Sequence, residues 1–375
     1  MATYRNFLKT VKMTNGIDMA KINFVASILL DLERIKYPYS GLGHFCSQLA
    51  LHLPALCEHR HRLNFLVSNP NSFRNPHHIP LTKASLVKKL LPQLTKSYDL
   101  WHSTHQGLFY RPSRKTKNHI ITIHDLNFLF EKSSNKKYLY LNRLQHFVEN
   151  CQGLTFISEF TKKMVLDNLH VGDVKTEVIY NGFERPTSMI FSRPDFLPKG
   201  DFLFTIGAIR SKKNFHVLLP FLKQLKDINL VIAGPHEHPY LGKLNELAKS
   251  EGIQNRIFLP GSISDEHKYW LYQHCKAFVF PSLYEGFGFP LVEAMSFGRP
   301  VFSSNQTSLP EVGGKNVFYW DNFHPDDMVQ TYIRKMSEFE NDPVISQNLI
   351  KRSKEFTWNN CANKYFQFYN KILGE

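Results

Sequence analysis

Short apolar runs alternate with longer helical patterns along nearly all of this 375-residue chain. Such alternation predicts parallel sheets that are covered by helices on both faces, because a crossover between parallel strands usually contains a helix. About six runs fall in each half, so we expect an α/β protein with two doubly wound, Rossmann-like domains rather than one very wide sheet. The predicted strands are residues 22–30, 63–68, 100–103, 119–124, 154–158 and 177–180, then 202–206, 229–233, 256–259, 277–280, 300–303 and 317–320.

The boundary between the two domains is best placed in a stretch rich in Pro, Ser and polar residues, 183–200. This linker separates a first domain at residues 1–182 from a second domain at residues 201–355. Residues 356–375 form an aromatic, amphipathic segment that we expect to pack back on the body as a helix. Residues 1–18 look unlike the rest of the chain and are a candidate tail. Because open α/β sheets bind ligands at the carboxyl ends of their strands, we expect the site in a central cleft.

The cysteines and the apolar runs limit the class of protein. Five cysteines, an odd number, are widely spaced without a Cys-x-x-Cys pair, which argues against a disulfide framework and against a cysteine zinc site. A reducing, cytoplasmic setting is the simplest interpretation. No uninterrupted apolar stretch reaches the roughly 20 residues that a membrane-spanning helix needs. We therefore expect a cytoplasmic protein that meets any membrane only at its surface.

The positive charge is concentrated in the first third of the chain. Residues 1–120 carry 17 Lys and Arg against 5 Asp and Glu, which accounts for most of the net charge of +14. One interpretation is a solvated basic face, and another is attraction to an anionic membrane surface or a lipid-phosphate acceptor. Residues 86–91, with Lys83 beside them, have the pattern of a basic amphipathic helix. Nucleic acid is disfavoured as a partner, because no helix-turn-helix, zinc finger or aromatic RNA-binding pattern accompanies the charge.

A glycine-rich turn between two glutamates is the most specific chemical feature. Glu285 and Glu293 flank Gly286-Phe287-Gly288-Phe289, and the apolar run 276–280 precedes them. The order strand, glycine-rich loop, helix leaves free backbone N–H groups at a helix N-terminus, where they can hold an anion. The carboxylates can accept hydrogen bonds from hydroxyls, so the pattern suggests a ligand made of sugar and phosphate. Considered alone, Glu293 could simply complement the helix dipole and Glu285 could be a solvated turn residue.

A basic loop follows the first predicted strand of the second domain. Gly207 ends that strand and would let a ligand approach the backbone. Arg210 and Lys213 could then neutralise a diphosphate as its charge develops. An ordinary surface turn that contains lysines would look similar.

The first domain supplies weaker candidates. His124 ends a predicted buried strand and faces the proposed cleft, although a lone histidine there is more often structural. Gly41 and Gly43 follow the first strand and precede a predicted helix at residues 45–53. A dinucleotide fingerprint would need glycine where the chain has Cys46, which disfavours NAD. The chain has no Asp-x-Asp motif that would suggest a metal-chelated nucleotide. The remaining histidines of polar loops are interpreted as surface residues; they are His59, His61, His77, His78, His236 and His238.

These motifs together resemble the retaining, nucleotide-sugar-dependent glycosyltransferases of family 4, the group 1 transferases, which have the two-domain GT-B fold. The resemblance covers most of the chain, and the glutamate string is its most specific part. The other matching stretches in the second domain are residues 207–214, 231–235, 258–261, 298–301 and 308–312, and those in the first are residues 41–43, 124–126, Ser158 and 181–182.

The resemblance implies a role for each matching residue. Glu293 would bind the donor ribose, and Glu285 would lie by the transferred sugar. The backbone of residues 286–289 would hold sugar hydroxyls and phosphate. Arg210 and Lys213 would bind the diphosphate, although many relatives carry the arginine directly after the glycine, where this chain has Ala208. His124 would contact the donor sugar near the reacting carbon, and Gly41 and Gly43 would let the first domain close on the diphosphate.

The function expected from this resemblance is retaining transfer of a hexose from a nucleotide diphosphate sugar to a glycan or glycolipid in surface polysaccharide or lipopolysaccharide synthesis. GDP-mannose is the first guess for the donor, with UDP-glucose or another UDP-hexose as the alternative. No metal and no further cofactor are expected. A non-catalytic nucleotide-sugar-binding or scaffold protein is the alternative from another class, and a dinucleotide-dependent oxidoreductase is a third. We expect the protein on the inner face of the membrane as a peripheral protein.

Overall fold

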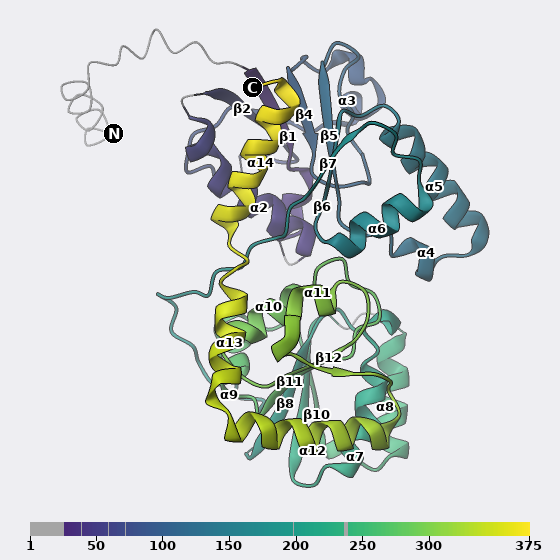
Figure 1. The fold of residues 1–375 in the computed structure, drawn as a ribbon, viewed down its shortest axis with the longest axis vertical. Coiled ribbons are helices and arrows are strands. Elements are labelled where there is room, and N and C mark those ends of the chain that lie inside the picture. The colour runs from purple at the N-terminus through teal and green to yellow at the C-terminus, as the bar shows by residue number, and fades with distance from the viewer. Residues whose placement is uncertain (1–25, 39, 59, 72, 198, 236–238) are drawn as a thin grey trace, which may run out of the picture. The chain divides into compact units, whose positions relative to one another are not determined.

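The computed structural model describes residues 26–38, 40–58, 60–71, 73–197, 199–235 and 239–375 (Figure 1). The candidate tail at residues 1–18 and the first residues of the predicted strand 22–30 lie outside the described residues. The described chain forms two compact units. Unit 1 comprises the described residues of Met1–Ile121, Cys151–Gly153 and Ala362–Glu375, and unit 2 comprises those of Thr122–Asn150 and Leu154–Cys361. The domain borders expected at residues 182 and 201 stay predictions.

Two sheets form the framework of the fold, and both are doubly wound, as the alternation of strands and helices predicted. The first sheet has seven strands in the order β3-β2-β1-β4-β5-β6-β7. The pairs β1–β2, β1–β4, β2–β3 and β4–β5 are all parallel. Its strands are β1 Ala26–Asp31, β2 His61–Val67, β3 Leu81–Lys83, β4 Leu100–Ser103, β5 Asn118–Ile123, β6 Gly153–Phe156 and β7 Lys175–Val178.

The second sheet has six strands in the order β10-β9-β8-β11-β12-β13, all of them parallel. The chain therefore starts in the middle of this sheet, moves to one edge, returns past β8 and ends at the other edge. Its strands are β8 Asp201–Ile206, β9 Ile228–Ala233, β10 Ile257–Gly261, β11 Ala277–Phe280, β12 Val301–Ser304 and β13 Phe318–Trp320.

All twelve strands expected from the sequence are present in this topology, and within the described residues their ends are shifted by up to two residues. Of the strands that the structure describes, only β3 was not predicted. Its three side chains are half-buried or exposed, so no apolar run marks it.

Helices cover both faces of the second sheet, and β11 shows why (Figure 1). All four of its side chains are buried, and they alternate between two hydrophobic clusters. Phe278 and Phe280 belong to the cluster that contains residues of α9, α10 and α13, whereas Ala277 and Val279 belong to the cluster with α7, α8 and α12. A strand that is apolar at every position needs a cover on both faces, as parallel sheets have.

The helices lie between successive strands, apart from the last three. In the first half they are η2 Glu33–Lys36, α2 Gly41–Cys57, α3 Leu86–Leu90, η3 Pro92–Leu94, α4 Phe128–Glu131, α5 Ser134–Val148 and α6 Glu159–Asn168. In the second half they are η4 Ser211–Lys213, η5 Phe215–Val217, α7 Leu218–Gln224, α8 Tyr240–Ser250, η6 Gln254–Arg256, α9 Asp265–His274, α10 Phe289–Ser296, α11 Leu309–Gly313, η7 Gly314–Asn316, α12 Pro325–Asn341, α13 Pro343–Ser353 and α14 Trp358–Leu373.

The end of α14 belongs to unit 1 and packs there through aromatic side chains. Tyr365 and Tyr369 are both fully buried. Tyr365 meets the ring of Phe45 edge-on at 5.9 Å between centroids, and the Tyr369 hydroxyl lies 2.7 Å from His102 Nδ1. A hydroxyl and an imidazole that pair with each other can both be buried at low cost.

His61 corrects one expectation for the histidines. It opens β2, is 2% exposed, and its Nε2 lies 2.8 Å from Asn370 Oδ1, so it is an internal residue rather than a surface one. His77 and His78 are exposed as expected. His59, His236 and His238 lie outside the described residues.

All five cysteines are buried and none forms a disulfide. Within the described part of the chain, no helix combines the length and the apolar character needed to cross a membrane.

Candidate active site

The loop after β8 places a lysine against the backbone. Gly207 follows β8 with φ of 152°, a conformation that side chains rarely adopt. A Cβ at this position would lie 3.1 Å from Lys213 Cε, so the lysine side chain lies over the glycine. Gly234, directly after β9, crosses so close to Gly207 that a Cβ on it would lie 2.1 Å from the Gly207 carbonyl oxygen. Two glycines therefore allow the loop to fold tightly under Lys213.

The loop after β11 leads into α10 as the sequence predicted. Gly288 is the residue before the helix and has φ of 97°, and Pro290 lies in the first turn. Phe287 is 2% exposed and meets Phe289 and Phe356 edge-on, at 5.4 and 5.5 Å between centroids. The Phe287 side chain thus belongs to the core, and only its backbone is available to a ligand.

An ion pair joins the two loops. Lys213 Nζ lies 2.5 Å from Glu285 Oε1, and the side chains are only 12% and 14% exposed. The same ammonium lies 5.1 Å from the centre of the Phe280 ring. Ser282 Oγ donates to Glu285 Oε1 at 2.7 Å, so the carboxylate has two donors on one oxygen. A lysine and a carboxylate that are nearly buried need each other as partners.

Further hydrogen bonds fix the position of Glu285. The backbone N–H of Leu283 donates to the Lys212 carbonyl at 2.8 Å, which ties the two loops together. Thr307 Oγ1 accepts from the N–H of Glu285 at 3.2 Å, and Ser308 Oγ donates to its carbonyl at 3.0 Å. Glu285 is therefore held by both of its backbone polar groups, which is the arrangement that a positioned functional group needs.

His124 and Gly286 meet through their backbones. His124 directly follows β5 and is 7% exposed. A Cβ on Gly286 would lie 2.0 Å from the His124 carbonyl oxygen, so only glycine fits there. Ser158 Oγ, at the N-cap of α6, donates to the Gly286 carbonyl at 2.7 Å, and Thr161 Oγ1 donates to that of His124 at 3.3 Å.

Glu293 lies on α10 and is held from α9. Tyr272 Oη donates to Glu293 Oε2 at 2.8 Å, and Lys268 Nζ lies 3.5 Å from Oε1. The Glu293 side chain is 15% exposed. The carboxylate is therefore oriented by two neighbours and is still open to solvent on one side.

The roles expected for Arg210, Gly41 and Gly43 stay predictions. Arg210 directly precedes η4 and is exposed. Gly41 and Gly43 belong to unit 1, where they lie in the first turn of α2 rather than in a loop. There the Ser40 side chain caps the helix by accepting from the N–H of Gly43 at 3.0 Å, and a Cβ on Gly43 would collide with the Tyr37 carbonyl oxygen at 2.0 Å.

Several residues that hold the site had no assigned role in the sequence analysis. The matched motif at residues 308–312 contains Glu311, whose carboxylate accepts from the N–H groups of Glu159 and Phe160 at 2.6 and 3.0 Å and from Tyr180 Oη at 2.7 Å. The other residues that hold the site without an assigned role are Ser158, Thr161, Lys268, Tyr272, Ser282 and Thr307. Isolated Ser, Thr and Tyr residues give no sequence pattern that reveals such contacts.

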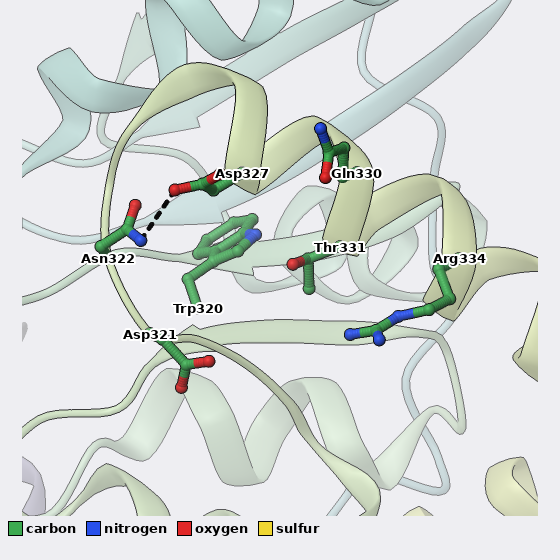
Figure 2. A pocket seen from close by; sticks show the side chains of 7 residues that line it. All are labelled: Trp320, Asp321, Asn322, Asp327, Gln330, Thr331 and Arg334. Carbon is green, nitrogen blue, oxygen red and sulfur yellow. Dashed lines mark hydrogen bonds between the residues drawn. The ribbon is translucent and has the colours of Figure 1, made fainter.

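A separate surface pocket of about 300 Å³ lies where β13 ends and α12 runs past (Figure 2). Asn322 Nδ2 donates to Asp327 Oδ2 across one side of it at 2.9 Å. None of the predicted site residues lines this pocket. Its lining residues are Trp320, Asp321, Asn322, Asp327, Gln330, Thr331 and Arg334.

Across the described residues, no three His, Cys, Asp or Glu side chains gather as a metal site would require. The expectation that the reaction needs no metal stays a prediction.

Comparison with known proteins places both parts of the chain. The family described as "Glycosyl transferases group 1" matches residues 190–356, and "Glycosyltransferase Family 4" matches residues 40–185. The O-antigen chain mannosyltransferase B of Escherichia coli is 25% identical over 92% of this chain and 100% of that protein.

Solved structures agree on the fold. A sucrose-phosphate synthase from Thermosynechococcus elongatus superimposes with a TM-score of 0.72 at 17% identity, over 93% of this chain and 99% of that one. The Anabaena protein HepE in complex with UDP-glucose superimposes with a TM-score of 0.70 at 16% identity, over 92% and 100% of the two chains. With the two Rossmann-like sheets and the two family matches, these findings confirm the resemblance drawn from the motifs. The chain belongs to glycosyltransferase family 4, the group 1 glycosyltransferases, which are retaining hexosyltransferases of the GT-B fold.

Proposed function

We propose that this protein transfers a hexose from a nucleoside diphosphate sugar to a growing glycan or glycolipid, with mannose from GDP-mannose as the first candidate. The observation that supports this most directly is the pair of Lys213 and Glu285. A cation after β8 lies 2.5 Å from a carboxylate after β11, beside the start of α10. Diphosphate needs a cation and backbone N–H groups, and a sugar needs a fixed carboxylate.

The proposed roles follow the chemistry of each group. Lys213, with Arg210 beside it in sequence, neutralises the diphosphate. Glu285 accepts hydrogen bonds from the transferred sugar, Glu293 accepts them from the ribose, and the backbone of residues 286–289 contributes N–H donors. His124 contacts the sugar near the reacting carbon, and Gly41 and Gly43 leave room for the diphosphate.

The reaction retains the configuration of the sugar, as family 4 enzymes do. In the proposed step the acceptor oxygen forms a bond to the anomeric carbon while the bond from that carbon to the diphosphate oxygen breaks. The acceptor proton passes to the departing diphosphate on the same face. Lys213 stabilises the negative charge that develops there, which is the kind of contribution that lowers such barriers most. Neither Glu285 nor Glu293 then acts as a nucleophile.

The choice of mannose rests on relatives. The name of the Escherichia coli protein that matches the full length describes an O-antigen chain mannosyltransferase. The Salmonella typhimurium protein that matches 56% of this chain, at 26% identity, carries the same description. UDP-glucose or another UDP-hexose is the alternative, since the solved HepE complex holds UDP-glucose. Synthesis of surface polysaccharide such as O-antigen is the corresponding pathway.

The acceptor side is proposed to meet an anionic membrane surface from the cytoplasm. On α3 and the turn after it, large apolar side chains are exposed among basic ones. Leu86, Leu90 and Leu94 are 67%, 65% and 61% exposed, and Lys88 and Lys89 lie among them. Apolar side chains with interspersed lysines bind anionic lipid surfaces. Binding to anionic vesicles should fall as salt rises and should weaken in Leu90→Asp; binding that salt does not change would contradict the electrostatic part.

The experiment that tests the function is a donor panel with purified protein. GDP, UDP and NAD are compared by thermal shift, and any of them at 100 times its dissociation constant should stabilise the protein by about 2.7 kcal/mol. Labelled GDP-mannose and UDP-glucose are then offered with lipid-linked glycan acceptors. Stabilisation by NAD alone would refute the proposal. Nucleotide binding without sugar transfer to any acceptor would favour the non-catalytic binding or scaffold protein.

A further inference from the structure

Glu293 is oriented by a short polar relay from helix α9. Lys268 and Tyr272 are four residues apart, so they lie on the same side of that helix. Asp265, in the first turn, lies 2.8 Å from Lys268 Nζ through its Oδ1. Lys268 in turn lies 3.5 Å from Glu293 Oε1, while Tyr272 Oη donates to Oε2 at 2.8 Å. Each carboxylate oxygen of Glu293 thus has one neighbour on α9.

The tyrosine is the less ordinary member of this relay. It is fully buried, and its ring also meets those of Phe204 and Phe278 at 5.0 and 5.2 Å between centroids. A tyrosine placed only for packing would leave its hydroxyl without a partner or could be phenylalanine. Here the hydroxyl reaches the edge of the core and meets a carboxylate that is 15% exposed.

The protonation states make the relay permanent. Burial and the Glu293 carboxylate raise the pKa of Tyr272 well above its ordinary value, so its hydroxyl keeps the proton and can only donate. Burial acts to lower the pKa of Lys268, but Glu293 and its other neighbours outweigh that effect and raise it. Near neutral pH a neutral donor and a cation therefore face Glu293.

The geometry points to a role for Tyr272 and Lys268 as positioning residues that orient Glu293 toward two adjacent hydroxyls of the donor ribose. This inference rests on the proposed function, in which Glu293 binds the ribose. A carboxylate oxygen can accept two hydrogen bonds, so one acceptor direction per oxygen stays open after the contacts to α9. Fixing the rotation of the carboxylate before the donor arrives removes an ordering cost from binding.

The experiment compares Tyr272→Phe with a matched control, Tyr332→Phe. Tyr332 is also buried and in unit 2, but its hydroxyl has no hydrogen-bond partner among the described residues. Binding of GDP and UDP, and of their 2′,3′-dideoxy analogues, is measured by calorimetry for the wild type and both variants. We expect Tyr272→Phe to weaken binding of the ribonucleotide about tenfold, the usual size for one hydrogen bond to a charged group. Binding of the dideoxy analogue should change less than twofold, and Tyr332→Phe should change neither.

Steady-state kinetics give a second readout. Because the ribose is remote from the reacting carbon, Tyr272→Phe should raise KM for the donor and leave kcat unchanged, as loss of uniform binding does. Lys268→Met, which removes the ammonium and keeps an unbranched apolar side chain, should show the same dependence on the ribose hydroxyls if the tyrosine variant does not fold.

Two results would overturn the inference while leaving the proposed function intact. One is an equal loss for the ribonucleotide and its dideoxy analogue, which indicates a structural role. The other is an unchanged ribonucleotide affinity in both Tyr272→Phe and Lys268→Met. If the wild-type protein binds neither GDP nor UDP, the proposed function fails, and the positioning role fails with it.

Discussion

Replacing Glu285 by glutamine should tighten the binding of a nucleoside diphosphate while it slows sugar transfer. Lys213 Nζ lies 2.5 Å from Glu285 Oε1. An incoming diphosphate must therefore compete with that carboxylate for the ammonium. Glutamine keeps the shape of the side chain and an oxygen that can accept from Ser282 Oγ, which donates to Glu285 at 2.7 Å.

The size of the effect follows from the geometry of this pair. Two unit charges 2.5 Å apart attract by ~7 kcal/mol at an effective dielectric constant of about 20, but taking both from water offsets most of that. A hydrogen bond to a charged group contributes a net 1.5–3 kcal/mol, against about 1 kcal/mol for a neutral one. The difference on replacing glutamate by glutamine is therefore about 0.5–2 kcal/mol, which corresponds to roughly two- to thirtyfold tighter binding of the diphosphate.

Calorimetry with GDP and UDP, without a sugar, measures this affinity at an ionic strength near 0.15 M, where distant charges are screened. The matched control is Glu131→Gln. It frees the neighbouring lysine, Lys212, whose Nζ lies 2.9 Å from Glu131 Oε1, and it changes the net charge by the same amount. We expect a change of less than twofold for the control. Turnover by Glu285→Gln should fall at least tenfold, because the sugar loses its carboxylate. Unchanged or weaker nucleotide binding by Glu285→Gln would refute the expected competition between Glu285 and the diphosphate for Lys213.

Other variants test the site and the core. Lys213→Ala should lower kcat by about 10²–10³ and should also lower the melting temperature, because Glu285 loses its partner; an unaltered rate would remove Lys213 from the site. Gly286→Ala should unfold at lower temperature and lose activity, because its Cβ would lie 2.0 Å from the His124 carbonyl oxygen; Gly242→Ala, where a Cβ meets nothing within 4 Å, should stabilise α8 by up to about 1 kcal/mol. Burial raises the pKa of Asp31 to about 7, so ionisation of Asp31 destabilises the folded state. This destabilisation is absent below about pH 4, grows between about pH 4 and pH 7, and is constant above about pH 7. Asp31→Asn, which can still accept from the N–H of Glu33, should therefore stabilise the protein by up to about 4 kcal/mol in urea unfolding at pH 8 and very little at pH 4, and a gain that does not change with pH would contradict this account.

The framework of the fold was predictable because it depends on patterns within short segments. A strand such as β11, with four buried side chains in a row, is apolar whatever lies beside it, and the sequence shows this directly. Strand β3 was missed because its three residues lie at the edge of the first sheet with half-exposed side chains. His61 was misjudged for a related reason, since its partner Asn370 lies 309 residues away in the sequence.

The same distinction explains what could be foreseen of the site. Glycines and glutamates at fixed spacing form a local pattern, so Gly207, Glu285 and Gly288 could be predicted before their geometry was known. The partners that hold them come from other segments, and a single serine or tyrosine carries no sequence pattern that predicts its hydrogen-bond partner. Tyr272 resembles any aromatic residue of a helix that faces a core, and only the position of α10 makes it a hydrogen-bond donor to Glu293. The residues proposed to contact the ligand are thus predicted by motif, whereas the residues that orient them are found only from the packing. The substitutions with the least obvious effects should lie among the second group.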